Sequence, residues 1–202
     1  MNSKKALLLV MMEPPAALEE EFHDWYDSEH LPQRRSLPGV ESGARWICLE
    51  GWPRWMAMYD LASSAVLETP EYAAVSGPNS TPWSKRILPR TVGRSRVTLQ
   101  ELADHSGVIG EDRAVARLLL MRFPHVSAQG QESLMAEISA MFGQQNGLLQ
   151  IRYFSQTDKA DNNLYALAAF DRVAAPSAMS TALQQVSSAA DIFNYYAPYH
   201  RA

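Results

Sequence analysis

The sequence contains one cysteine and no hydrophobic run long enough to cross a membrane. Because Cys48 has no second cysteine to pair with, an intrachain disulfide is impossible and a cysteine-based zinc site is disfavoured. This composition suits a reducing cytosol, so we expect a cytoplasmic protein. A membrane-spanning helix needs about 20 apolar residues, whereas the run at residues 6–12 stops at Glu13. No small-residue cleavage site follows that run, so we interpret it as a buried strand rather than a signal peptide.

The chain also lacks an excess of positive charge, because its net charge is −4 at neutral pH. Surfaces that bind nucleic acids or anionic membranes are usually basic, so we expect neither as a partner. The chain has no glycine-rich phosphate loop and no G-x-S-x-G motif. Its five histidines show no metal-ligand spacing. We therefore expect no metal and no cofactor, with His125, which follows a predicted strand, as the weak candidate for a haem or metal ligand.

Two halves of the chain show the same order of predicted elements. Hydrophobic runs and helical spacing predict strands and helices that alternate as β-α-β-β-α-β in each half. The first half contains strands at 6–12, 40–49, 55–61 and within 87–99, a helix that ends near His30, a helix at 64–75 and a loop at 76–82. The second half contains strands at 115–123, 148–154, 164–170 and 193–199, and helices at 131–142 and 176–192. Pro32 sets the end of the first helix, because proline disfavours helical geometry in the residue before it.

This repeated order predicts an α+β fold of two tandem ferredoxin-like repeats. Each repeat would form an antiparallel sheet with its helices on one face. Packing the two sheets face to face, as an α+β barrel, would cover the remaining apolar faces. We expect repeat 1 at residues 1–102, a polar linker at 103–113 and repeat 2 at 114–202.

Residues 22–39 are the most informative stretch, because they combine aromatic, acidic, histidine and arginine residues in one helix and the turn after it. The run Trp25-Tyr26-Asp27-Ser28-Glu29-His30-Leu31-Pro32, a following arginine and Pro38-Gly39-Val40 resemble the signature of the dimeric α+β barrel superfamily. The similarity is greatest to its EthD-like branch. The corresponding segment of the second half, residues 139–145, has neither histidine nor proline.

The resemblance implies a pocket between sheet and helices for a small, aromatic or polyunsaturated, oxygen-rich molecule. Members of the superfamily include cofactor-free monooxygenases, polyketide cyclases, decarboxylases, lactone isomerases and haem enzymes. It also implies that the first repeat carries the site and the second serves as its built-in partner. We expect a homodimer in addition.

His30 is the best catalytic candidate, because an imidazole can give or take a proton near neutral pH. The helix end favours its charged form, and Asp27 or Glu29 could raise its pKa. The alternative is a histidine that only caps the helix. Tyr26 lies four residues earlier on the same face and could donate a hydrogen bond to substrate, while Trp25 lies about 100° away and is a candidate for the pocket wall.

Basic residues gather without any acid in the segment Lys85, Arg86, Arg90, Arg94 and Arg96. Guanidinium groups bind carboxylates in a bidentate manner, so Arg90 is a candidate substrate contact. The alternative is a solvated strand edge whose charges prevent aggregation. Arg34 and Arg45 are further anion-binding candidates, and Trp46 could stack on a planar ligand or belong to the core.

These features favour a cofactor-free enzyme that acts by proton transfer on a carboxylated aromatic or ring-opened dienoic acid. His30 would be the acid/base, Tyr26 would bind an enolate oxygen, and the arginines would hold the carboxylate. Isomerisation, decarboxylation, dehydration and ester cleavage all need these groups, so the reaction stays open. The alternatives are a non-catalytic ligand-binding accessory protein and a cofactor-free or haem-dependent oxygenase.

Overall fold

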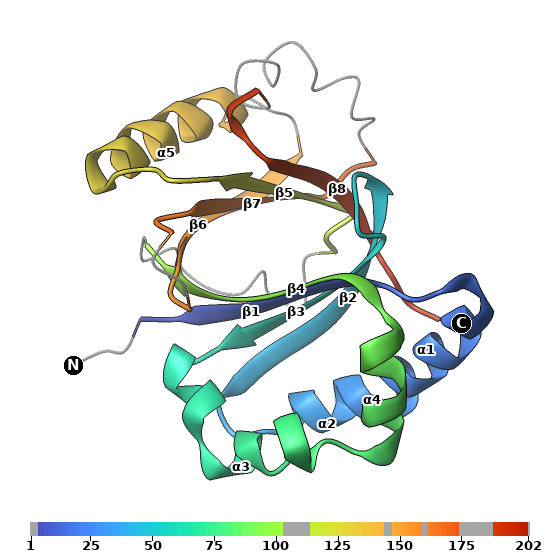
Figure 1. Ribbon diagram of the computed structural model, residues 1–202. Coiled ribbons are helices and arrows are strands. Elements are labelled where there is room, and N and C mark those ends of the chain that lie inside the picture. The colour runs from blue at the N-terminus through green and yellow to red at the C-terminus, as the bar shows by residue number, and fades with distance from the viewer. Residues whose placement is uncertain (1–3, 103–113, 144–146, 159–160, 174–187, 202) are drawn as a thin grey trace. The chain divides into compact units, whose positions relative to one another are not determined.

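Figure 1 shows the computed structural model of the chain, which describes residues 4–102, 114–143, 147–158, 161–173 and 188–201. The chain divides into two compact units. Unit 1 comprises Met1–Trp46, Pro53–Gln100 and Tyr199–Ala202, and unit 2 comprises Ile47–Trp52 and Glu101–Pro198. The predicted linker at 103–113 lies outside the described residues.

The two units contain sheets with the same strand order. In unit 1 the order is β4-β1-β3-β2, with β1 at Ala6–Glu13, β2 at Val40–Glu50, β3 at Trp55–Leu61 and β4 at Val92–Glu101. In unit 2 it is β8-β5-β7-β6, with β5 at Arg117–Phe123, β6 at Leu148–Gln156, β7 at Leu164–Phe170 and β8 at Ile192–Pro198. The strands that flank β1 and β5 are antiparallel to them. The predicted α+β fold of two tandem ferredoxin-like repeats is confirmed.

The continuous apolar run in β1 has a structural reason. Side chains alternate between the faces of a strand, so Leu8, Val10 and Met12 share one face and Leu7 and Leu9 share the other. Leu7 and Leu9 are fully buried, and Leu8 and Met12 are almost fully buried. A strand that is buried on both faces has no polar alternation.

The first helical segment continues past its predicted end, so the prediction that it stops near His30 is wrong. It consists of α1 (Glu19–Trp25), one π turn (Tyr26–His30) and α2 (Leu31–Arg35). In the π turn the Leu31 N–H donates to the carbonyl of Tyr26, five residues earlier. Pro32 then lies in the first turn of α2, and because proline has no N–H, this position donates no helical hydrogen bond.

The predicted helix at 64–75 is also interrupted. A 3₁₀ segment spans Ser64–Glu68 and α3 spans Pro70–Ala73. Pro70 keeps Thr69 extended, and the Thr69 hydroxyl accepts the N–H of Tyr72 as an N-cap.

The described residues contain two more α-helices, and short 3₁₀ helices at Ala16–Leu18, Gly77–Asn79 and Leu88–Arg90. Sequence reasoning missed α4 (Pro82–Ile87), whose N-cap is Thr81. In unit 2, α5 spans Ala128–Phe142 and starts at the N-cap Ser127, whereas most of the helix predicted at 176–192 lies outside the described residues. Helices α1–α4 lie along one face of the sheet of unit 1 (Figure 1). Within the described ranges, no helix is long and apolar enough to cross a membrane.

Candidate functional site

Unit 1 contains a cavity of about 340 Å³ that is lined by its sheet and its helical segments. We call it the His30 cavity. The sheet supplies an apolar wall of Leu8, Val10 and Met12 from one face of β1. Its volume is near the lower end of the range for small-molecule sites, about 300–1,000 Å³.

The polar part of the wall comes from the predicted motif and from the sheet. His30 ends the π turn, and Arg34 follows four residues later on the same helical face. Tyr59 of β3 pairs with Leu8 of β1, and this register brings its side chain to the same cavity. The tertiary structure therefore brings together one imidazole, one guanidinium and one phenol.

Three polar atoms of these side chains are buried and have no hydrogen-bond partner in the protein. They are His30 Nδ1, Arg34 Nη1 and Tyr59 Oη. Buried polar groups are almost always paired, because an unpaired one costs about 1–3 kcal/mol. Three exceptions in the wall of one cavity indicate a site that is completed by a polar ligand.

Arg34 is held so that only part of its guanidinium is available. Its Nη2 donates to the Val75 carbonyl at 2.9 Å, and the guanidinium carbon lies 5.0 Å from the Tyr72 ring centroid. The Tyr72 hydroxyl accepts a hydrogen bond from Arg96 at 3.2 Å. Arg34 is thus pre-positioned, with Nη1 left for a ligand.

His30 is neutral in this environment. Burial first, and then the positive charge of Arg34, lower the pKa of His30 to about 3. Its ring centroid lies 4.3 Å from that of Trp25 and 5.3 Å from that of Tyr26. Burial also raises the pKa of Tyr59 well above its ordinary value, so its hydroxyl keeps the proton.

The expectation that Asp27 or Glu29 raises the pKa of His30 is therefore wrong. Asp27 pairs with Arg45 at 2.6 Å, and Glu29 accepts the Thr81 hydroxyl at 2.5 Å. Both carboxylates have other partners, and desolvation dominates at His30.

The other predicted site residues do not line the His30 cavity. Trp25 is fully buried and donates its indole N–H to Ser84 at 3.1 Å. Tyr26 lies under the guanidinium of Arg45, 4.5 Å from its ring centroid, and burial raises the pKa of Tyr26 to about 12. Trp46 is buried in the core. Their predicted functional roles stay predictions.

Two predicted arginines have other positions. Arg45 is buried, lies beside His23 with 2.8 Å between Nη2 and Nδ1, and lines a second cavity. Arg90 is exposed and donates to the Arg86 carbonyl at 2.5 Å. From the basic segment, the structure places Arg94 and Arg96 at the His30 cavity. Strand β4 starts only at Val92, so the alternation begins after Arg90.

Tyr59 and Tyr72 are the site residues that sequence reasoning missed. Neither belongs to the motif, and a tyrosine in an apolar strand is usually a core residue. The available signal was the alternation of side chains in β3, which places Tyr59 and Leu61 on the same face of the strand. This alternation does not show which face of the sheet lines a cavity.

A haem or metal does not fit the donors of this cavity. The lining contains one imidazole and no carboxylate or thiol, and the positive charge of Arg34 beside His30 opposes a bound cation. His125 adopts a left-handed turn after β5, with φ 56°. Among the residues that the structure describes, no cluster of three or more His, Cys, Asp or Glu side chains could hold a metal ion.

Comparison with known proteins shows likeness of fold. The sequence matches no protein-family model and no curated protein sequence. An anthrone oxidase-like protein is 14% identical with a TM-score of 0.61, covering 98% of this chain and 92% of that one. A candidate monooxygenase from Fusobacterium nucleatum is 8% identical with a TM-score of 0.62, covering 98% and 93%.

A third solved structure shows the same likeness of fold. Chlorite dismutase from Candidatus Nitrospira defluvii, in complex with imidazole, is 9% identical with a TM-score of 0.64, covering 100% of this chain and 93% of that one. At such identities the comparisons show a shared ferredoxin-like α+β fold and do not establish an activity.

Proposed function

We propose that the protein is a cofactor-independent oxygenase that ionises a small phenolic or enolisable aromatic molecule in the His30 cavity. The observation that carries the proposal is the set of three buried, unpartnered polar atoms on His30, Arg34 and Tyr59. An oxygen-rich aromatic ligand would supply partners for these atoms and cover the apolar wall of β1.

Proton removal is the step that these residues suit. Neutral His30 accepts a proton from the substrate on the ring nitrogen that carries the lone pair. The anion formed is stabilised by hydrogen bonds from Arg34 Nη1 and Tyr59 Oη. The anion also offsets the charge of Arg34, which raises the pKa of His30 during the reaction.

Dioxygen is the proposed co-substrate. An electron-rich carbanion can form a C–O bond with dioxygen, and loss of water then leaves a carbonyl. For a methylene carbon the balance is R₂CH₂ + O₂ → R₂C=O + H₂O, with no external reductant. The named activities of two fold neighbours, an anthrone oxidase-like protein and a candidate monooxygenase, support oxygen chemistry over isomerisation.

The rim of the cavity favours an acidic substrate. Arg94 and Arg96 line the cavity and are exposed. Two guanidinium groups on alternate residues of β4 suit a carboxylate or an ionised phenol. A carboxylated or polyhydroxylated aromatic molecule is therefore the proposed substrate class.

The proposal also covers the family relationship and the oligomeric state of the protein. The motif at Trp25–Pro32 supports membership of the EthD-like branch, and that resemblance supports a homodimer. Sedimentation velocity of the full chain at two concentrations would detect the dimer, and a single monomeric species at both would refute it.

The test of function is oxygen consumption. Purified protein would be mixed with hydroxylated anthrones, naphthols and their carboxylated derivatives in an oxygen-electrode cell, with product analysis. We expect one O₂ consumed per carbonyl formed, and a rate lowered about 10²-fold or more in His30→Gln. Arg90→Gln is the matched control, because this arginine is exposed and does not line the cavity.

Three results would change or refute the proposal. Product formation without oxygen uptake, still dependent on His30, would favour the isomerase or lyase alternative. Binding of these molecules without any turnover would favour the accessory ligand-binding protein. Equal rates of oxygen consumption by wild type and His30→Gln would refute the proposed role of His30 as the base.

A further inference from the structure

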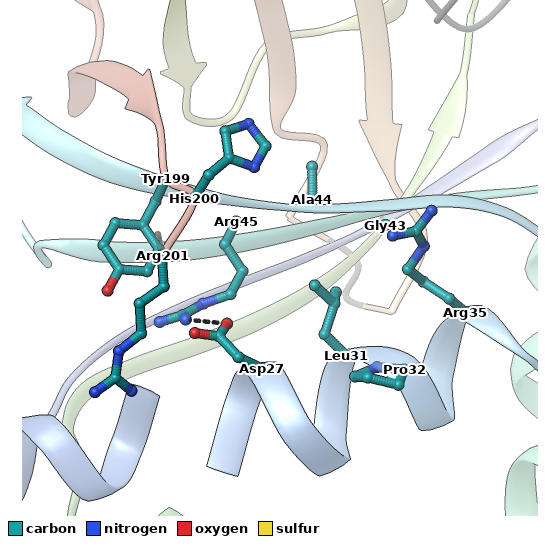
Figure 2. A pocket seen from close by; sticks show the side chains of 10 residues that line it. All are labelled: Asp27, Leu31, Pro32, Arg35, Gly43, Ala44, Arg45, Tyr199, His200 and Arg201. Atoms are coloured by element: carbon teal, nitrogen blue, oxygen red, sulfur yellow. Dashed lines mark hydrogen bonds and ion pairs between the residues drawn. The ribbon is translucent and has the colours of Figure 1, made fainter. Parts of the chain in front are cut away.

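Unit 1 contains a second cavity, of about 600 Å³, which shares no lining residue with the His30 cavity. Figure 2 shows that Asp27, Leu31, Pro32 and Arg35 project from one helical segment beside β2 and the C-terminal residues. We call it the Asp27 cavity. The site is independent of the proposed oxygenase function.

One end of the Asp27 cavity offers a hydrogen-bond acceptor. Oδ1 of Asp27 pairs with Arg45 at 2.6 Å, while Oδ2 is buried and has no partner in the protein. Arg45 is only 4% exposed and also lies 2.8 Å from Nδ1 of His23. Because Arg45 already neutralises the carboxylate, Oδ2 suits a neutral donor such as a hydroxyl or an amide N–H.

The other end offers a cation without a counter-ion. Arg35 is exposed, and within the described parts of the chain it takes part in no hydrogen bond or ion pair. By contrast, Arg201 at the rim pairs with Glu20 at 2.9 Å and also with Asp24. Arg35 is therefore the charge in this wall that remains available to an anion.

The position of Arg35 is built into the strand beside it. A Cβ at residue 43 would lie 2.9 Å from Cγ of Arg35, so Gly43 leaves the room that the arginine stem occupies. In Figure 2 the Arg35 side chain reaches toward Gly43 on β2. This packing places the stem of the Arg35 side chain against β2, in the wall of the cavity.

The wall between the two ends is apolar and has a defined length. Leu31, Pro32 and Ala44 line it. Asp27 and Arg35 are eight residues apart, which corresponds to about 12 Å along a helix axis at 1.5 Å per residue. A ligand that reaches both ends needs polar groups separated by an apolar segment.

We propose that the Asp27 cavity binds an elongated carboxylic acid that carries a hydroxyl or amide N–H donor at its far end. The carboxylate lies on the guanidinium of Arg35, the donor lies on Oδ2 of Asp27, and the apolar segment covers Leu31 and Pro32. One negative charge on the ligand matches the one uncompensated charge in the wall.

The test is calorimetric titration of the full chain with ω-hydroxy carboxylic acids of increasing chain length. Alkanoates of matched length lack the donor, and α,ω-diols lack the carboxylate. We expect one length to bind best, and both analogues of that length to bind at least about 10-fold more weakly, a loss of 1.4 kcal/mol.

Variants assign the ligand to this cavity. Arg35→Gln should weaken binding at least about 10-fold while keeping the wild-type melting temperature, because Arg35 is exposed and unpaired. Asp27→Asn should abolish the preference for the hydroxy acid over the alkanoate. Arg34→Gln changes the His30 cavity and should leave the affinity unchanged.

Three outcomes would overturn the proposal. The first is no saturable binding by any member of the series with a Kd below about 10 mM. The second is equal affinity in wild type and Arg35→Gln. The third is loss of binding in Arg34→Gln, which would place the ligand in the His30 cavity. Since Arg35→Gln leaves the Asp27–Arg45 pair intact, misfolding of Asp27→Asn would not obscure these results.

Discussion

Replacing Tyr59 by phenylalanine is expected to stabilise the protein and to impair its site. The Tyr59 side chain is 2% exposed, and its hydroxyl is buried without a hydrogen-bond partner in the protein. Burial also raises the pKa of this phenol, so the hydroxyl is a neutral donor with nothing to donate to. Phenylalanine keeps the ring that packs near Gly43 and removes only the unsatisfied group.

The size of the effect follows from the desolvation of one hydroxyl. Burying such a group without a compensating hydrogen bond costs about 1–3 kcal/mol. Tyr59→Phe should therefore raise the free energy of unfolding by about that amount. For a chain of this length each kcal/mol corresponds to a rise of about 2–4 °C in melting temperature.

The catalytic rate should fall in the same variant, although its stability rises. Loss of one preorganised donor to a developing anion typically lowers the rate by about 10²–10³-fold. Oxygen consumption by Tyr59→Phe, measured with the best aromatic substrate, should fall by at least about 10²-fold. Stability gained and activity lost in one variant is the expected signature of a polar group retained for a ligand.

The matched control is Tyr153→Phe in unit 2. Its hydroxyl lies 2.7 Å from the Ser139 hydroxyl and donates to the Met135 carbonyl at 3.1 Å. Removing a hydroxyl that is already paired should destabilise the protein by about 0.5–1.5 kcal/mol. Both variants would be compared with wild type by thermal and urea unfolding.

Two results would refute the reasoning about Tyr59. A loss of about 1 kcal/mol or more on Tyr59→Phe would show that the hydroxyl has a stabilising partner in the unliganded protein. Unchanged oxygen consumption would show that the hydroxyl does not contact the reacting atoms.

Three further predictions concern other parts of the molecule. Burial lowers the pKa of His30 from 6.5 to about 3. Below pH 6.5 the unfolded chain therefore binds a proton that the folded chain does not, and acid destabilises the fold. In urea titrations between pH 6.5 and 4.5, wild type should lose up to about 2 kcal/mol more stability than His30→Gln. Arg152 lies 3.0 Å from the buried carboxylate of Glu101, and Arg152→Met removes this cation. The free energy of unfolding, measured in urea, should fall by about 3–5 kcal/mol. Gly39→Ala adds a Cβ 2.6 Å from Val66 Cγ2 at a φ of +82° and should lower the melting temperature, with a cost above about 1 kcal/mol.

Each of these predictions has a contradicting result. Parallel pH profiles for wild type and His30→Gln would mean that the imidazole titrates as in solution. A neutral or stabilising Arg152→Met would mean that solvent or another group compensates the Glu101 carboxylate. An unchanged melting temperature for Gly39→Ala would mean that this turn relaxes without cost.

Strand positions could be predicted well because their signals are local. The predicted limits of β3 and β7 agree with the structure, since both are apolar runs bounded by turn residues such as Pro53 and Asn162. The order of elements in each half was also predictable, and it led to the ferredoxin-like fold. Helix limits were predicted less well, because Pro32 does not reveal whether the helix stops or shifts its hydrogen bonds by one residue.

The candidate site was only partly predictable. His30 and Arg34 were each predicted as site residues, but the helix was predicted to end near His30, so their shared helical face was not predicted. Tyr59 joins them through the pairing of β3 with β1. In this pairing Tyr59 lies opposite Leu8, which is 51 positions away in the sequence. Arg45 has the residue type expected for an anion site, yet its pairing with Asp27 and His23 makes it part of the Asp27 cavity wall.

The sequence by itself determined the α+β class, the repeated strand order and the helix that carries His30. These follow from periodicity and turn chemistry, which act over a few residues. Only the tertiary structure decided that His30 is neutral, that Tyr59 and Arg34 share its cavity, and that Arg94 and Arg96 line it. Strand register and desolvation depend on contacts between residues distant in the chain, and neighbouring carboxylates in the sequence gave the wrong sign for the pKa of His30.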